Sequence, residues 1–219
     1  SYLSYDRISR FASTLAQEAP RTVVLDAGHG GEDGGASGQS GVPEKEINLA
    51  IAKNLQQLLT VSGYRVVMTR EDDTSTADDG FGTVRERKTS DLHNRMKMIE
   101  KQDDCIFISI HQNHFPQKQY SGTQVFYSKN NDNSKELAEN IRARVAGLLQ
   151  NDNKRETKPA TSSIYLLWHA KVPAVLVECG FLSNAEEEKK LERSDYQKQI
   201  AFAVYCGFLD YCAGIRQPA

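Results

Sequence analysis

Two histidines lie where a metal ion could bind. His29 follows the β-branched run 22–27 and His111 follows the apolar run 105–110, so each comes just after an expected strand. In open α/β sheets, ligands bind in the crevice outside the carboxyl ends of the strands. A carboxylate could join the imidazoles from Glu44 or from Glu46, which spacing alone does not separate. Two histidines and a carboxylate, with a water in the fourth position, form a hydrolytic zinc arrangement in which the metal lowers the pKa of the water.

A further glutamate could act on that water. Glu178 directly follows the apolar run 173–177, at the expected head of a parallel strand. Its carboxylate is placed to act as a general base that deprotonates the water and then protonates a leaving amine. The alternative is a structural carboxylate that caps the following turn. Asp26 is expected to orient His29 rather than to bind the metal.

Two other kinds of site compete with a metal centre. The segment GHGGEDGG resembles a phosphate-binding loop, but it lacks the Lys-Ser/Thr of a P-loop and no helix begins directly after its glycines. Cys179 could be a thiol nucleophile paired with His29 or His111, although a buried cysteine that packs as a small apolar residue is more common. The chain has four cysteines and no CxxC pair, so we expect free thiols.

Alternating strand and helix patterns surround these residues. They predict a single α/β domain with a twisted, mostly parallel sheet of about six strands and helices on both faces. Strands are expected at 22–27, 64–69, 105–110, 122–127, 164–167 and 173–177, and helices at 46–62, 92–101, 134–149 and 196–211. The polar segments 71–90 and 150–162 are expected to be loops. We expect a partly helical lead-in over 1–21, a catalytic domain over 22–213 and a short tail over 214–219.

Composition narrows the class of protein. The 219 residues are 39% hydrophobic and 26% charged, which suits one domain with a substantial core. The net charge of −2 disfavours nucleic-acid binding through bulk charge. No apolar run approaches the ~20 residues that a transmembrane helix needs. The chain starts at Ser1 without a methionine. We therefore expect that a targeting segment has been removed from this sequence by processing or cloning, and export remains open.

The motifs together resemble the zinc-dependent N-acetylmuramoyl-L-alanine amidases, which cut the bond between the glycan and the stem peptide of bacterial peptidoglycan. VLDAGHGG at 24–31 is similar to the family's opening strand and first metal histidine, and EKEINL at 44–49 to its metal carboxylate. SIHQN at 109–113 resembles the second histidine box, and VECGFLSN at 177–184 the catalytic-glutamate box. The resemblance implies zinc on His29, Glu44 and His111, with Glu178 as general base. Asn113 is expected to contact the substrate.

Two segments resemble one branch of that family. RKTSDLHNR at 87–95 and IYLL at 164–167 are similar to the sporulation- and germination-specific amidases of endospore formers. Membership would imply cleavage in the spore cortex, as the step that precedes muramic δ-lactam formation. The segment 115–121 is too short to hold the autoinhibitory helix of the cell-division amidases.

Membership of this branch also implies a location, a substrate and a partner for the protein. We expect an exported protein in the cell envelope or the forespore intermembrane space, acting on peptidoglycan and gated by an envelope lipoprotein. The alternative is a non-catalytic or partner-activated peptidoglycan-binding protein with the amidase fold.

Overall fold

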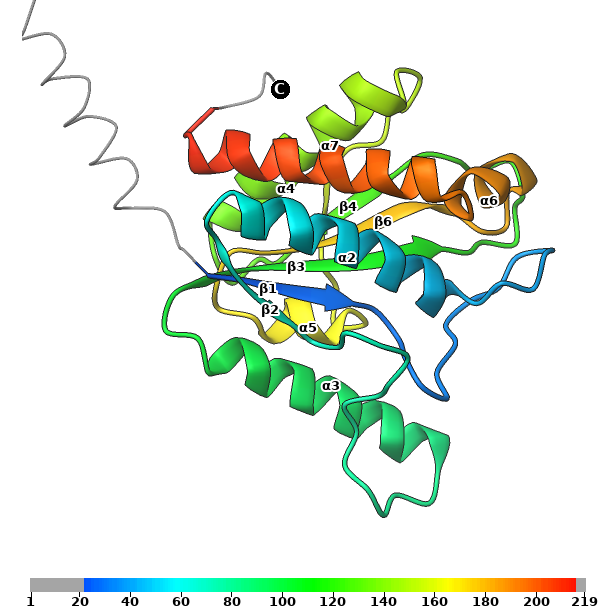
Figure 1. The fold of residues 1–219 in the computed structure, drawn as a ribbon, viewed down its shortest axis with the longest axis vertical. Helices are drawn as coiled ribbons and strands as arrows, with labels where there is room; N and C mark the ends of the chain where they lie inside the picture. Colours follow the sequence, from blue (N-terminus) through cyan, green and yellow to red (C-terminus); the bar gives the residue numbers. More distant parts are fainter. Residues whose placement is uncertain (1–21, 216–219) are drawn as a thin grey trace, which may run out of the picture.

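The computed structural model describes residues 22–215. The expected lead-in over 1–21 and most of the expected tail over 214–219 lie outside the described residues. Six strands form one sheet in the order β2-β1-β3-β6-β4-β5 (Figure 1). Their bounds are β1 (Thr22–Ala27), β2 (Arg65–Met68), β3 (Cys105–Asn113), β4 (Gln124–Tyr127), β5 (Lys158–Pro159) and β6 (Ala174–Phe181). The strands β2, β1, β3 and β6 are parallel, whereas β4 is antiparallel to β6 and carries β5 parallel to itself.

Helices cover both faces of this sheet (Figure 1). They are α2 (Glu44–Val61), α3 (Val84–Glu100), α4 (Asn133–Leu149), α5 (Tyr165–His169), α6 (Ala185–Leu191) and α7 (Ser194–Cys212). One core lies between the sheet and α2, α4 and α7, and a smaller core lies between the sheet and α3 and α5. Because both faces are covered, the central strands read as nearly continuous apolar runs. The predicted single α/β domain with a mostly parallel six-stranded sheet is confirmed.

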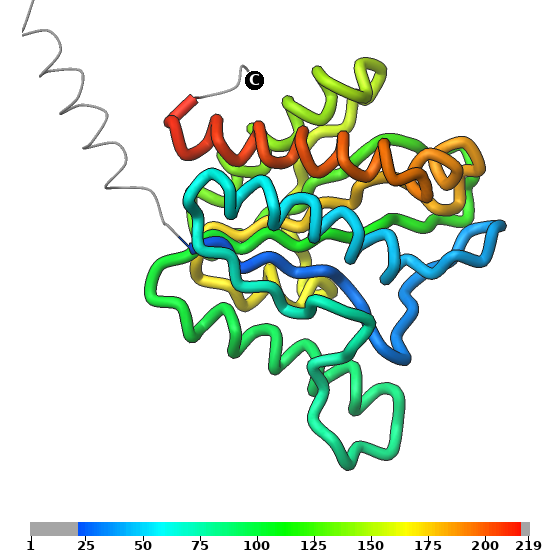
Figure 2. Tube along the Cα trace, in the orientation of Figure 1, coloured from blue at the N-terminus to red at the C-terminus, as the bar shows by residue number. Residues whose placement is uncertain are grey.

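The two cores use alternate residues of the same strand. In β1, Val23 and Leu25 pack against the α2, α4 and α7 side, while Val24 packs against the α3 and α5 side. Successive side chains of a strand point to opposite faces, so a strand buried on both sides needs apolar residues at every position. Figure 2 shows the chain leaving β1 and β3 at the same end of the sheet.

Several element boundaries differ from the sequence-based expectations. Helix α3 begins at Val84 rather than at 92, because Thr83 and Glu86 form a capping box that starts the helix inside the expected loop. The strand expected at 164–167 is wrong: it is the helix α5, a short apolar run of the kind that periodicity cannot assign. Helix α6 and the two-residue β5 were not expected, and β5 lies in the expected loop 150–162.

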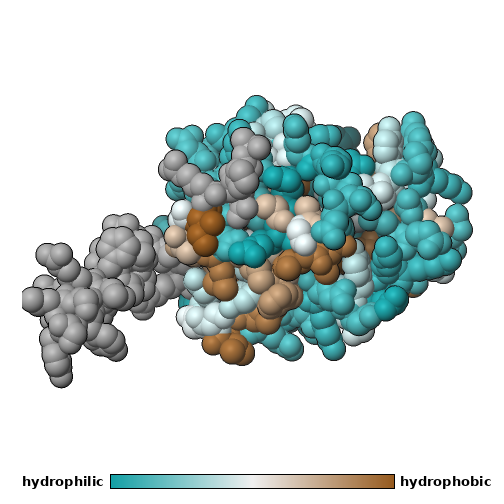
Figure 3. All heavy atoms as spheres, turned by 90° about the horizontal axis from the view of Figure 1, so that it is seen from above, coloured by the Kyte–Doolittle hydropathy of each residue, from teal (hydrophilic) through white to brown (hydrophobic). Residues whose placement is uncertain are grey.

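The central strands are also longer than expected. Strand β3 continues to Asn113 and β6 to Phe181, so His111 and Glu178 lie within strands and not after them. Within residues 22–215, no helix combines the length and hydrophobicity that crossing a membrane requires. On the side of the molecule that carries α7, hydrophobic side chains interrupt a mostly hydrophilic surface (Figure 3).

Candidate metal centre and active site

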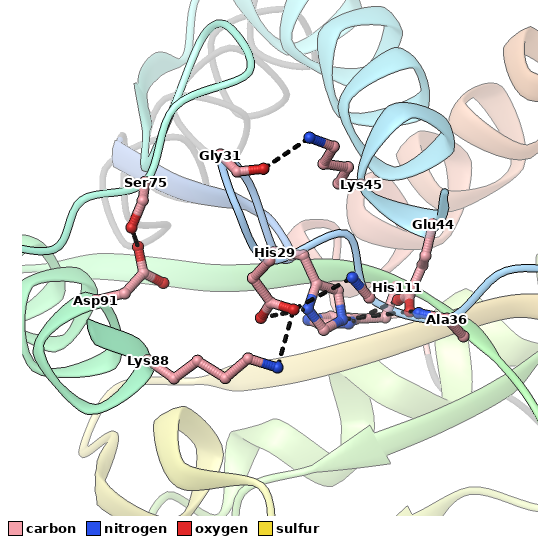
Figure 4. Close-up of polar contacts among 12 residues, drawn as sticks. His29, Gly31, Ala36, Glu44, Lys45, Ser75, Lys88, Asp91 and His111 are labelled. Carbon is pink, nitrogen blue, oxygen red and sulfur yellow. Dashed lines mark hydrogen bonds and ion pairs between the residues drawn. The ribbon is translucent and has the colours of Figure 1, made fainter. Parts of the chain in front are cut away.

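His29, Glu44 and His111 converge at the carboxyl end of the parallel strands (Figure 4). One ligand atom from each lies within 4.8 Å of the others. The Nε2 atom of His29 is 3.2 Å from Oε2 of Glu44, and Nδ1 of His111 is 3.0 Å from Oε1 of Glu44. The two imidazole rings meet edge to face, with centroids 4.9 Å apart. Two imidazoles and one carboxylate at this spacing fit a transition-metal ion of the zinc type.

Glycines let these side chains approach one another. A Cβ atom on Gly28 would lie 2.2 Å from the His111 ring, and one on Gly35 would lie 2.6 Å from Oε2 of Glu44. His29 itself has a φ of 64°, which is uncommon for a residue other than glycine. The glycine-rich segment is therefore required by the close packing of the ligands and by the turn that presents His29.

Glu44 is fixed by donors on both of its oxygens. The backbone N–H of Ala36 donates to Oε2 at 3.0 Å, and the backbone N–H of Gln112 donates to Oε1 at 2.9 Å. The side-chain amide of Asn48, one turn further along α2, also donates to Oε1. Burial opposes ionisation of Glu44, but hydrogen bonds and charge from His111 and His29 hold its pKa well below the usual range. Glu44 is thus held as a buried carboxylate, the form that binds a metal.

Asp33, not Asp26, orients His29. Nδ1 of His29 lies 2.9 Å from Oδ2 of Asp33, and Lys88 of α3 pairs with the other oxygen of Asp33 at 2.9 Å. Burial lowers the pKa of His29, but Asp33 and Glu44 outweigh it and raise that pKa to about 9 in the metal-free protein. A carboxylate on the far nitrogen of a ligating histidine fixes its tautomer and ring orientation. The expectation that Asp26 has this role is wrong.

Asp26 instead anchors a buried network beneath the ligands. Arg95 of α3 donates from Nη1 to Asp26 at 2.7 Å, while Thr69 and Ser109 donate their hydroxyls to the same carboxylate. Burial raises the pKa of Asp26, but the charge of Arg95, with further help from His111 and Ser109, lowers it to about 2. Asp26 and Arg95 are 1% and 2% exposed, so this is a fully buried ion pair.

Two arginines donate hydrogen bonds to the backbone of the segment that carries His29. Arg95 donates to the carbonyl oxygens of Ala27 and His29 at 2.8 and 2.7 Å. Arg70 donates to the carbonyl oxygens of Ala27 and Gly28 at 2.9 and 3.1 Å. Three consecutive carbonyl groups therefore point at buried guanidinium groups, which stabilises the positive φ of His29. Sequence reasoning missed Arg95 because it lies 66 residues from His29 along the chain.

Glu178 lies beside His111 on the neighbouring strand. The register of β3 and β6 places the two residues directly opposite one another. Its Oε2 atom is shielded from solvent and has no hydrogen-bond partner among the described residues. Burial and the nearby charge of Glu44 raise the pKa of Glu178 to about 8. A carboxyl group with a pKa near neutrality, beside candidate metal ligands, has the properties of a general acid–base catalyst.

A cavity of about 540 Å³ adjoins the ligands. His29 and His111 line one side of it, and the loop 75–81 with the first turns of α3 lines the other. Lys88 and Arg87 of α3 also line the cavity, where they pair with Asp33 and Glu32. The segment 71–90, expected to be only an irregular loop, thus supplies a wall of the site.

The remaining candidate residues lie in different surroundings. Asn113 ends β3 beside Phe181, and its carbonyl accepts a hydrogen bond from Leu182, which leaves its expected substrate contact a prediction. Cys179 is fully buried in the core under α2, α4 and α7, on the opposite face of β6 from Glu178. Burial raises the pKa of its thiol far above the usual range. A buried, protonated thiol is inert, so the Cys179 nucleophile is excluded. All four cysteines are free, as expected.

The fold and the site define an α/β protein with a candidate metal centre at the carboxyl edge of its parallel strands, next to a carboxyl group suited to acid–base catalysis. A family model described as N-acetylmuramoyl-L-alanine amidase matches residues 23–210. The germination-specific N-acetylmuramoyl-L-alanine amidase of Bacillus subtilis is 36% identical over 191 residues, which are 87% of this chain and 79% of that protein.

Solved structures agree with this match. The CwlD amidase from Clostridioides difficile, in complex with the GerS lipoprotein, superposes with a TM-score of 0.85 at 42% identity, over 88% of this chain and 98% of that one. The amidase AmiC2 of Nostoc punctiforme superposes with a TM-score of 0.73 at 30% identity, over 88% and 98% of the two chains. The chain belongs to the N-acetylmuramoyl-L-alanine amidase family. It is a hydrolase of the amide bond between N-acetylmuramic acid and L-alanine in peptidoglycan.

Proposed function

We propose that this amidase uses a zinc ion held by His29, Glu44 and His111, with Glu178 as the general base. The observation that carries the proposal is the position of Glu178, which lies opposite His111 and whose Oε2 has no hydrogen-bond partner in residues 22–215. Nitrogen and carboxylate donors in a set of three, leaving a coordination position open, suit a catalytic rather than a structural zinc site. When bound there, zinc supplies a Lewis acid that polarises the amide carbonyl and acidifies a water molecule.

The chain's own residues supply the proton transfers and the positioning. Glu178 accepts a proton from the attacking water at Oε2 and passes it to the nitrogen of the L-alanine leaving group. Its raised pKa suits both halves of this transfer near neutral pH. Asp33 orients the His29 ring, and the donors from Ala36, Gln112 and Asn48 hold Glu44.

The substrate is proposed to be spore-cortex peptidoglycan. The support is the likeness to a germination-specific amidase and to the CwlD amidase. In that role, release of the stem peptide leaves an N-acetylmuramic acid residue with a free lactyl carboxyl group, which a separate deacetylase can then convert to muramic δ-lactam. The place of action would be the cell envelope or the forespore intermembrane space, and an envelope lipoprotein would act as partner, as GerS accompanies the CwlD amidase.

Activity and metal content test the catalytic part separately. The purified chain is incubated with peptidoglycan, and mass spectrometry follows peptides that carry a new L-alanine amino terminus. We expect zinc-dependent release, and we expect Glu178→Gln to lower turnover at least about a hundredfold while retaining zinc by elemental analysis. Loss of zinc in Glu178→Gln would contradict the assigned roles. Full zinc content in the wild type without any cleavage, even with a lipoprotein partner from its own organism, would favour the non-catalytic alternative.

Cortex and vegetative wall are separated by the substrate supplied. Cortex peptidoglycan is treated with the chain and a muramic acid deacetylase, and the products are analysed for muramic δ-lactam. We expect lactam only when both proteins are present. Equal peptide release from vegetative wall, with no lactam from cortex, would contradict the proposal that spore cortex is the substrate.

A further inference from the structure

An exposed aromatic cluster lies at the same edge of the sheet as the metal centre. Phe115 and Tyr120 are 46% and 41% exposed, and their rings meet edge to face with centroids 5.5 Å apart. Tyr120 also contacts the ring of Phe181, which is buried, with centroids 6.3 Å apart. The Arg155 guanidinium lies over Phe181 at 4.6 Å and over Tyr120 at 5.8 Å. We call Phe115, Tyr120 and Phe181, with Arg155, the aromatic platform.

The backbone ties this platform to the catalytic strands. Phe115 is four residues beyond His111, and Phe181 is three residues beyond Glu178. The N–H of Leu182 donates to the carbonyl of Asn113 at 2.8 Å, and the N–H of Phe115 donates to the Ser183 hydroxyl at 3.0 Å. The platform is therefore continuous with the ends of β3 and β6, the strands that carry His111 and Glu178.

The cavity and the platform are associated with different parts of the sheet. The sheet order places β3 between β1 and β6. The cavity extends from His29, after β1, toward α3 and the loop 75–81. The platform follows β3 and β6 instead. A substrate bound across the centre would have one arm in the cavity and the other on the platform.

The two surfaces have different chemistry. The cavity wall carries ionised groups of both signs, among them Asp78, Arg87 and Lys88, beside apolar side chains such as Phe81 and Leu166. The platform offers aromatic rings and one guanidinium group. A stem peptide carries carboxylates, amides and amines, whereas the face of a pyranose ring presents C–H groups. These C–H groups are attracted to the negative face of an aromatic ring.

We propose that the aromatic platform binds the glycan strand beside the reacting muramoyl residue, and that the stem peptide occupies the cavity, whose lining mixes charged and apolar side chains. This inference rests on the proposed function and adds which surface binds the glycan and which binds the stem peptide. Phe115 and Tyr120 stack on sugar rings and add binding energy for the glycan strand, without touching the reacting atoms. The polar groups of the cavity meet the peptide that leaves.

A binding experiment tests the platform without any cleavage. Peptide-free glycan strands, which contain no scissile amide, are titrated by calorimetry into the wild-type chain and into Phe115→Ala, Tyr120→Ala and Tyr120→Phe. We expect about tenfold weaker binding for each alanine variant and nearly unchanged binding for Tyr120→Phe, which keeps the aromatic ring. Phe202→Ala is the matched control, because Phe202 is 50% exposed on α7 and also pairs with a tyrosine. Thermal unfolding confirms that each variant is folded.

A kinetic experiment tests the same assignment during turnover. We expect Phe115→Ala and Tyr120→Ala to raise KM about tenfold for polymeric peptidoglycan, with kcat nearly unchanged and with little effect on a single N-acetylmuramoyl peptide that lacks neighbouring sugars. Glycan binding equal to wild type in both alanine variants, or an equal loss in Phe202→Ala, would overturn the proposal. Failure of the amidase reaction in the wild type would instead refute the proposed function, because the glycan titration does not depend on cleavage.

Discussion

His111 and Glu178 lie directly opposite one another on the parallel strands β3 and β6. This register puts a candidate metal ligand and an acid with a partnerless oxygen on one face of the sheet. Two long, buried, in-register strands are rigid supports, so the distance between the candidate ligand and the candidate base is set by the sheet rather than by loops. Glu44 then reaches the same point from the first turn of α2, and His29 from the turn after β1.

Asp33 is expected to tune metal affinity through His29. Asp33→Asn removes the charge that orients Nδ1 of His29, and we expect zinc affinity to fall about tenfold to a hundredfold. The neighbouring Glu32→Gln is the matched control, because Glu32 is 78% exposed and pairs only with Arg87 among the ion pairs of residues 22–215. Competition with a chelating dye measures both affinities. Equal zinc affinity in the two variants would contradict the role of Asp33.

Gly28 is expected to be intolerant of any side chain. A Cβ atom in Gly28→Ala would overlap the His111 ring at 2.2 Å, so the ring must move and the ligand set is disrupted. We expect loss of stoichiometric zinc and of turnover, measured by elemental analysis and peptide release. Gly147→Ala in α4 has no atom within 4 Å of the added carbon, and we expect it to keep its zinc and gain up to about 1 kcal/mol of stability. Full zinc content in Gly28→Ala would refute this packing argument.

Arg95 is expected to be essential for stability. Arg95→Met leaves the carboxylate of Asp26 buried without its cation, and we expect the free energy of unfolding to fall by about 3 to 5 kcal/mol. Urea denaturation measures this loss. Arg193→Met provides the comparison, because the ion pair of Arg193 with Asp195 is more than half exposed and its removal should change stability little. Similar losses of unfolding free energy in both variants would contradict a special contribution of the Asp26–Arg95 ion pair to stability.

Glu178 is expected to reduce stability at alkaline pH in the zinc-free protein. Its pKa is raised by folding from an ordinary 4.5 to about 8, so the unfolded chain loses this proton first as the pH rises. Stability is therefore lost progressively between pH 4.5 and about 8. We expect zinc-free Glu178→Gln to match wild type near pH 4 and to exceed it by on the order of 1 to 3 kcal/mol above pH 8. Denaturant titrations at several pH values test this, and a pH-independent difference would contradict it.

The sequence by itself determined which residues could form the site. The strand patterns at 22–27 and 105–110 placed both histidines at one edge of a parallel sheet, and the family boxes distinguished Glu44 from Glu46. The core strands could be predicted because a strand buried on both faces must be apolar throughout. The α/β architecture followed from the alternation of strands and helices.

Only the tertiary structure decided what surrounds those residues. Asp26 is three residues from His29 along the chain, but its carboxylate pairs with the distant Arg95. The carboxylate that contacts the His29 ring is that of Asp33. The start of α3 depends on one capping box, and the helix brings Lys88 to the site from a segment that was expected to be a loop. Hydrogen bonds and ion pairs between distant segments depend on how the helices pack across the sheet. Local sequence patterns do not predict that packing.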